Sequence, residues 1–191
     1  MILEKDKSRI YRVCMHEAAH IVIANLYSYG CIDMSITFSN FEHSGAAEID
    51  LFKRDIDTFE KLESHLRERI QILYAGVIAE SINLETEEHD MKYALDQWKN
   101  GGGVDDHKKI RELTRIYRNF KYPKTDSSEN AVKELKELDD ELITITGNLV
   151  FEHLDKIKSL ADKIFAKVNR YDQIFSLSKD EIADALKEQL L

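Results

Sequence analysis

Apolar residues spaced three and four positions apart run through most of this sequence, and this periodicity limits its possible folds more than any other feature. Such spacing predicts amphipathic α-helices, each with one face turned toward a core. A single proline, Pro123, interrupts the 191 residues, and residue types that favour helices predominate. We therefore expect one mainly helical domain over 1–191, divided into a first half at 1–123 and a C-terminal helical part at 130–191.

The order of the expected elements can be taken from the same periodicity. The helices are expected at 7–29, 57–83, 90–99, 105–120 and 130–170, the last with a break near Gly147, and a terminal helix begins at Ser178. Between the first two helices, Ile32, Met34, Ile36 and Phe38 alternate with polar residues, which predicts a half-buried strand. A second short strand at about 46–51 follows. The fold class is thus α+β, mainly α with a small β-sheet.

Turn signals at Ser39-Asn40 and Ser44-Gly45 separate the two expected strands, which would form a short hairpin directly after the first helix. The edge strand of such a hairpin can hold an extended peptide through backbone hydrogen bonds. Alternatively, the hairpin only covers the core. The sequence leaves both interpretations open.

The first helix carries the pattern H-E-x-x-H in His16-Glu17-Ala18-Ala19-His20. On a helix, positions i and i+4 share one face, so His16 and His20 can offer two imidazole nitrogens to one ion. Glu17 lies beside the pair, where a carboxylate can accept a proton from a metal-bound water. The alternative interpretation is a pair of helical histidines at the edge of a core.

Other candidate residues come from later in the chain. Asp105 and Asp106 open a helix, where an aspartate either caps the helix or places a carboxylate rigidly enough to complete a zinc site. Glu80 follows an apolar stretch and either supports a ligand histidine or ends the helix in solvent. The remaining histidines have no ligand spacing: His43, His65, His89, His107 and His153.

Composition narrows the classes of partner and the compartment. The net charge of −9 and the absence of a basic stripe exclude nucleic acid as an expected partner. No run approaches 18 apolar residues, and no secretory signal is visible, so we expect no membrane partner. Cys14 and Cys31 are the two cysteines, and their count favours a reduced, cytoplasmic setting over a single disulfide.

The order of these parts resembles the zinc peptidase domain of the FtsH family, the ATP-dependent membrane proteases, over most of 8–188. Residues 16–20 are similar to the family's H-E-A-G-H helix, and 72–80 to its apolar helix that ends G-G-R-x-A-E. Residues 102–106 are similar to its G-A-S-N-D segment. Residues 149–186 look like its closing helices. The resemblance implies an FtsH-peptidase-like helical domain.

In that family the aspartate of the G-A-S-N-D segment is the third zinc ligand, so the resemblance implies that His16, His20 and Asp106 bind zinc. The family has a small apolar residue four positions after this aspartate and a leucine seven positions after it. Ile110 and Leu113 stand at these positions relative to Asp106. The resemblance therefore favours Asp106 over its neighbour.

Asp105 remains the alternative third ligand. The sequence departs from the family at Ala19, where glycine is usual, and in a longer connection between Glu80 and Asp106 that carries an expected helix of its own. We also expect neither an ATPase module nor a membrane anchor in this chain. The longer connection predicts that the substrate groove of this chain is covered differently from the groove of the family.

Motif and resemblance together predict a zinc-dependent metalloendopeptidase with Glu17 as general base, which hydrolyses peptide bonds in flexible or unfolded polypeptides. A separate ATPase partner could supply such substrates, and the ring assembly of the family implies a possible homo-oligomer. The alternatives are a non-catalytic or regulatory binding protein on the same fold, a stand-alone protease that cuts one specific partner, and a structural domain without metal.

Overall fold

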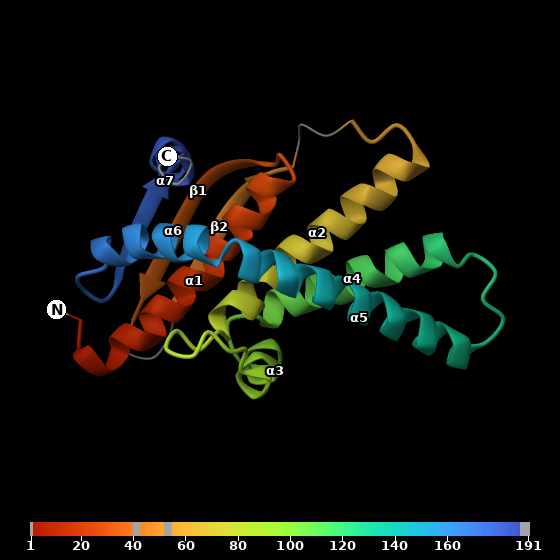
Figure 1. Cartoon of the computed structure of the whole chain (residues 1–191), viewed down its shortest axis with the longest axis horizontal. Helices are drawn as coiled ribbons and strands as arrows, with labels where there is room; N and C mark the ends of the chain where they lie inside the picture. The colour runs from red at the N-terminus through yellow and green to blue at the C-terminus, as the bar shows by residue number, and fades with distance from the viewer. Residues whose placement is uncertain (1, 40–42, 52–54, 188–191) are drawn as a thin grey trace.

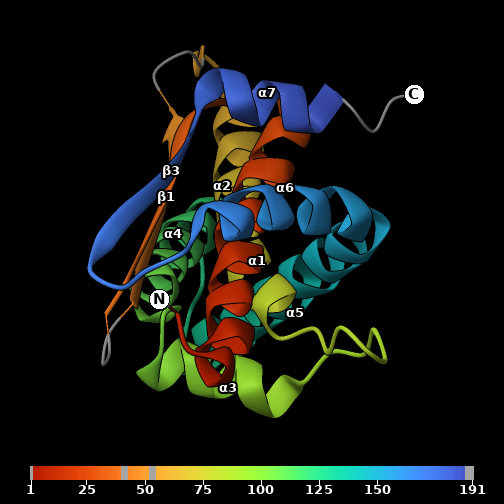
Figure 2. The same cartoon turned by 90° about the vertical axis from the view of Figure 1, so that its left-hand side faces the viewer.

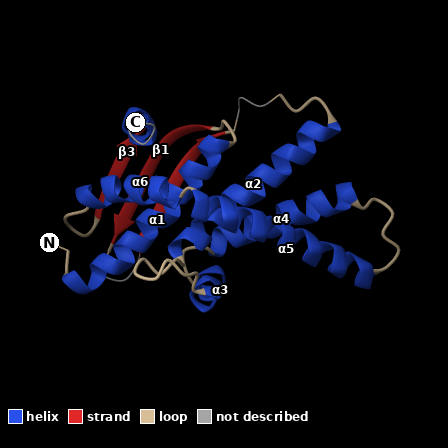
Figure 3. Cartoon of the chain, in the orientation of Figure 1, coloured by secondary structure: helices blue, strands red, loops and turns tan. Residues whose placement is uncertain are grey.

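The computed structural model describes residues 2–39, 43–51 and 55–187, and these residues form seven helices and three strands. The helices are α1 (Glu4–Leu26), α2 (Phe59–Glu80), α3 (Met91–Asn100), α4 (Val104–Lys121), α5 (Ser128–Glu152), α6 (Leu154–Lys167) and α7 (Lys179–Lys187). The strands are β1 (Gly30–Phe38), β2 (His43–Asp50) and β3 (Gln173–Ser178). A mainly helical α+β fold with a small sheet is therefore confirmed (Figure 3).

The sheet is antiparallel, with the strand order β2-β1-β3, so β2 lies at one edge. Met34 in the central strand pairs with Ala47 on one side and with Leu177 on the other. The alternation that predicted β1 therefore has a physical basis, since Met34, Ile36 and Phe38 all turn to the core face. The strand β3 joins the C-terminal part of the chain to this sheet.

Helix α1 passes through the middle of the molecule, and all twelve positions from Val13 to Ala24 are buried, polar residues included. Helices α2 and α6 pack against it, and the sheet covers another side (Figures 1 and 2). A helix that is enclosed on several sides has few solvent-facing positions, which explains why this stretch of α1 lacks lysine and arginine. The histidine pair therefore lies within the core, not at its margin.

Three expectations about the elements were wrong. The helix does not break at Gly147 but continues to Glu152, and the break falls at His153, which lies between α5 and α6. A β-carbon on Gly147 would meet no atom within 4 Å, so nothing forces the helix to bend there. The proposed turn at Ser44-Gly45 lies inside β2, which pairs with β1 from His43 onward.

The third error was an omission, since β3 was not expected at all. Its residues alternate in burial, and Leu177 is its buried member. The expected turn residue Asn40 lies outside the described residues, and so does Leu190, which we expected on the inward face of the terminal helix. Both cysteines are free thiols, which removes the alternative of a disulfide. Among the described helices, none combines the length and apolar character that a membrane crossing requires.

Candidate metal centre

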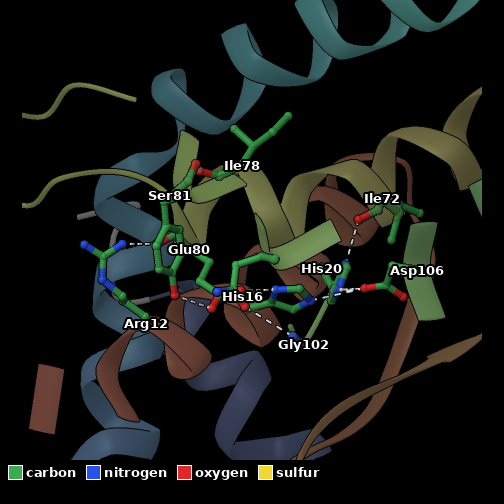
Figure 4. A network of polar contacts seen from close by, with 11 residues as sticks. Arg12, His16, His20, Ile72, Ile78, Glu80, Ser81, Gly102 and Asp106 are labelled. Atoms are coloured by element: carbon green, nitrogen blue, oxygen red, sulfur yellow. Dashed lines mark hydrogen bonds and ion pairs between the residues drawn. The ribbon is translucent and has the colours of Figure 1, made fainter. Parts of the chain in front are cut away.

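His16 and His20 lie one turn apart on the buried part of α1, and both side chains are almost fully enclosed. Their ring centroids are 4.7 Å apart, with the ring planes nearly perpendicular. Figure 4 shows both rings turned toward Asp106, with Glu80 on the far side of His16. The face that the i, i+4 spacing predicted is therefore present, and the helix presents both imidazoles to one point.

The orientation of His20 is set by the backbone of α2. Its Nδ1 lies 2.7 Å from the carbonyl oxygen of Ile72, and a carbonyl oxygen can only accept a hydrogen bond. Nδ1 of His20 must therefore carry the proton and donate it. In the neutral imidazole this leaves a lone pair on Nε2, which is the atom that faces Asp106.

Gly76 makes this close approach of α2 possible. A β-carbon at Gly76 would lie 2.6 Å from Nε2 of His16 and 2.6 Å from both Cε1 and Nε2 of His20. Separations under 3.0 Å essentially never occur for real β-carbons. The absence of a side chain at Gly76 therefore lets α2 lie directly against the two imidazole rings.

The orientation of His16 is set by Glu80, at the end of α2. Nδ1 of His16 donates to Oε2 of Glu80 over 2.9 Å, and the Glu80 side chain is buried. The hydroxyl of Tyr93 in α3 donates to the other carboxylate oxygen, over 2.9 Å. Arg12 completes the network, since its guanidinium donates to the backbone oxygen of Glu80 and lies over the Tyr93 ring.

These contacts decide between the two interpretations of Glu80. It is not a solvated helix end but a buried partner of a candidate ligand histidine. Hydrogen bonding of this kind fixes the tautomer and the ring direction of metal-binding histidines. Tyr93 was missed in the sequence because it lies far from the motif, and only the packing of α3 on α2 brings it there. Arg12 was also missed, although it lies four positions before His16 on the same helix and this spacing could have selected it.

Asp106 lies in the first turn of α4 and points toward both histidines. Its Oδ2 is 3.1 Å from Nε2 of His16 and 3.1 Å from Nε2 of His20. Asp105 does not reach the site, because its side chain is 79% exposed and pairs with Lys108. The structure therefore brings Asp106, not Asp105, to the histidine pair.

The two histidines and Asp106 offer three ligand atoms within 4.8 Å of one another. Ligand atoms around a tetrahedral zinc lie about 3.3 Å apart when each bond is about 2.0–2.1 Å long. The two measured nitrogen–oxygen separations of 3.1 Å are close to this value. Two imidazole nitrogens and one carboxylate oxygen also form a ligand set that zinc accepts. The residues present therefore fit a zinc ion.

The electrostatics of the cluster favour a positive charge at its centre. Burial lowers the pKa of His16, but hydrogen bonds with Asp106 and Glu80 and the charge of Glu17 outweigh burial and raise this pKa well above its usual value. Burial raises the pKa of Asp106, but the charge of His20 and hydrogen bonds from both histidines outweigh it, so this pKa is lowered. The lone pairs of two imidazole nitrogens and a carboxylate oxygen repel one another at this distance unless a proton or a metal ion lies between them.

Glu17 lies on α1 next to His16, and its carboxylate packs against Gly45 of β2. A β-carbon at Gly45 would overlap the Glu17 carboxylate, so this strand can approach only because the residue is glycine. Burial raises the pKa of Glu17, and the charges of the two histidines lower it by less. A raised pKa moves a carboxylate toward the range in which a general base is most effective.

Two cavities meet at Glu17, one of about 370 Å³ and one of about 410 Å³. His16, Glu17 and Gly45 line both of them. The larger cavity runs along β2 from Gly45 to Ile49, so the edge strand forms one wall of the space beside the candidate metal centre. An extended peptide in this cavity would lie against a free strand edge.

His43, at the start of β2, lines the smaller cavity together with His16 and Glu17. Its ring stacks on Phe38, and burial lowers its pKa. No spacing in the sequence selects His43, because it lies far from the ligand motif in the chain. Its place in the cavity follows from the pairing of β2 with β1.

Neither a protein-family model nor a curated protein sequence matches this chain.

Proposed function

We propose that this protein is a zinc-dependent metallopeptidase in which His16, His20 and Asp106 hold the metal and Glu17 is the general base. The observation that carries this proposal is the convergence of three ligand atoms beside a buried carboxylate, at an open cavity. The helix with the motif, the hairpin and the aspartate helix also follow one another in the order that the FtsH-type resemblance implies.

A bound zinc ion would polarise a peptide carbonyl and lower the pKa of a coordinated water. The chain's own residues would do the rest of the chemistry. Glu17 would accept a proton from the attacking water and return it to the leaving amine. Ile72 and Glu80 would hold the imidazoles in the tautomer that turns Nε2 toward the metal.

The substrate would be an extended polypeptide. The unpaired edge of β2 offers backbone donors and acceptors along the cavity, and β-strand addition is a common mode of peptide binding. The extended segments of a folded protein are mostly paired within its own sheets. Flexible peptides or unfolded chains are therefore the substrate class that the edge of β2 would bind. A separate ATPase partner and a homo-oligomeric assembly belong to the proposal through the resemblance alone.

The decisive variant is Glu17→Gln, which keeps the shape of the side chain and removes its proton affinity. We expect zinc binding to be unchanged and the hydrolysis of an unstructured substrate such as casein to fall by about 10²- to 10⁴-fold. Zinc content is measured by elemental analysis, and cleavage by mass spectrometry. Wild-type cleavage by the Glu17→Gln protein would refute the assignment.

The competing functions give other results in the same experiment. A binding or regulatory protein would form stable complexes with unstructured chains but would not cleave them, with or without zinc. A protease dedicated to one partner would cut that partner and leave casein intact. A purely structural domain would purify without stoichiometric metal and would bind none on titration.

A further inference from the structure

Arg69 lies in the larger cavity, on the same wall of α2 as the residues that contact the histidines. Its Nη1 is buried and has no hydrogen-bond partner within the described ranges. A buried guanidinium nitrogen without a partner is costly, because the donor has lost water and gained nothing in exchange. Such a group therefore indicates a ligand that would supply the missing acceptor.

The position of Arg69 is fixed by the same helix that shapes the metal centre. Arg69, Ile72 and Gly76 are spaced by three and four positions, so they share one face of α2. Seven residues of helix separate Arg69 from Gly76 by about 10 Å along the axis. An extended peptide covers about 10 Å with three residues, so Arg69 can reach a substrate group within about three residues of the cleaved bond.

The lining of the cavity carries both signs of charge, and the guanidinium of Arg69 is the group that can bind an anion at this position. Burial lowers the pKa of Arg69 and the charges of Tyr29 and Asp106 raise it, so Arg69 is close enough to Asp106 for their charges to interact. Lys109 of α4 is a second cation in the lining of the cavity, and its Nζ lies 3.9 Å from Oδ1 of Asp106.

Four acidic residues also line the cavity, and within the described ranges none of them is hydrogen-bonded to Nη1 of Arg69. Asp106 is bonded to the two histidines, and Glu17 packs against Gly45. Asp105 is exposed and bonded to Lys108, and Glu48 is exposed on β2. Arg69 therefore keeps a buried donor without a bonded acceptor even though carboxylates line the same cavity.

We propose that Arg69 determines specificity by binding a substrate carboxylate within about three residues of the cleaved peptide bond. This inference rests on the proposed peptidase function. The carboxylate has two possible sources, an aspartate or glutamate side chain or the C-terminus of a short peptide. The planar guanidinium matches either one, since its donors form two parallel hydrogen bonds to a carboxylate.

The test uses ten-residue neutral peptides that carry one glutamate at each successive position, with matched glutamine peptides and with free or amidated C-termini. For the wild-type protein, we expect a fixed spacing of at most three residues between glutamate and the cleaved bond. The glutamate peptides should have a kcat/KM about 10- to 100-fold above their glutamine counterparts. Preference for free over amidated ends alone would identify the C-terminal carboxylate as the source.

The variants separate charge from structure. Arg69→Met should abolish the preference for glutamate, Arg69→Lys should restore part of it, and the control Arg115→Met, on the exposed face of α4, should leave it intact. A readout without catalysis is the affinity of the labelled peptides for the Glu17→Gln protein, measured by fluorescence anisotropy. Circular dichroism and zinc content verify that each variant is folded and retains its metal.

Equal cleavage of glutamate and glutamine peptides, or an undiminished preference in Arg69→Met, would overturn the inference and leave the peptidase proposal standing. Charge-selective binding that depends on Arg69 but is never followed by cleavage would refute the peptidase and support carboxylate recognition. Absence of both cleavage and binding would overturn both.

Discussion

Each imidazole of the candidate metal centre is oriented by a different kind of partner. His20 donates to a main-chain carbonyl inside a helix, which no substitution of the Ile72 side chain removes. His16 donates to the Glu80 carboxylate, which Tyr93 in turn holds. The two Nε2 atoms therefore point at Asp106 for independent reasons, and a loss of one partner leaves the other histidine in place.

At the residue scale, the choice of the third ligand can be tested with neighbouring variants. Asp106→Ala removes an oxygen that lies 3.1 Å from both histidines, and we expect zinc affinity to fall by more than about 100-fold. Asp105→Ala removes an exposed side chain and should leave the affinity unchanged. Competition titrations with a zinc-binding dye measure both. Equal losses in the two variants would contradict the assignment.

A second residue-scale prediction concerns the contact between α2 and the rings. Gly76→Ala adds a methyl group 2.6 Å from the imidazoles, so α2 must move away or the rings must turn. We expect zinc affinity to fall by about 10- to 100-fold, as it does when histidine orientation is lost. The same titration measures it. Unchanged affinity in Gly76→Ala would show that the rings tolerate displacement.

At the element scale, helix α5 shows that a glycine does not by itself mark a helix end. Gly147 stands within a helix that continues to Glu152, and its surroundings are open. The break occurs at His153, where a non-helical backbone conformation (φ −111°, ψ 20°) ends α5 and begins α6. The change of apolar register near this point was visible in the sequence, but its position was not.

This contrast gives a prediction about stability. Gly147→Ala removes the extra backbone freedom of glycine in the unfolded chain and adds no clash, so it should stabilise the protein by about 0.5–1 kcal/mol. The free energy of unfolding in urea measures the effect. It also serves as the control for Gly76→Ala, since both place alanine in a helix. Destabilisation by Gly147→Ala would mean that α5 is bent at this residue.

At the scale of the whole molecule, the two expected parts of the chain share one sheet and one core. β3 pairs with β1, and α6 packs against α1. Ile157 of α6 is fully buried in the same apolar cluster as Ile21 of α1. The C-terminal part therefore encloses the helix that carries the histidines, and the site depends on residues far from it in sequence.

The shared core predicts cooperative unfolding. Ile157→Ala should lower the free energy of unfolding by about 2–5 kcal/mol, because it leaves a cavity in the core. Trp98, the one tryptophan of the chain, lies in the first half and reports its unfolding by fluorescence, while circular dichroism reports all helices. We expect both signals to shift together. As a control, Ile174→Ala changes an exposed side chain. It should change the free energy of unfolding by no more than about 0.5 kcal/mol, whichever signal is used.

Independent behaviour of the two parts would give a different result. In that case the Trp98 fluorescence transition of Ile157→Ala would stay at the wild-type urea concentration, while part of the circular dichroism signal would move. Separate expression of residues 1–123 gives a further comparison. This segment lacks α6, which packs against α1, and β3, which pairs with one edge of β1.

Local patterns in the sequence determined the helices, the first strand and the paired faces of the motif. Periodicity of three and four residues reports which side of a helix is apolar, and the i, i+4 spacing places His16 and His20 together without reference to any other element. Strand β3 was not predicted, because a six-residue alternation between two helices is a weak signal. Its pairing partner also lies more than 130 positions earlier.

Only the tertiary structure decided which partners meet the motif. The contacts of Glu80, Tyr93 and Gly76 depend on how α2 packs against α1 and α3 against α2, and the choice of Asp106 over Asp105 depends on which side of α4 faces the histidines. The contacts that orient the two histidines join residues 52 to 90 positions apart, over which a single sequence carries no spacing rule. The chain thus encodes one half of the site locally, while packing supplies the other half.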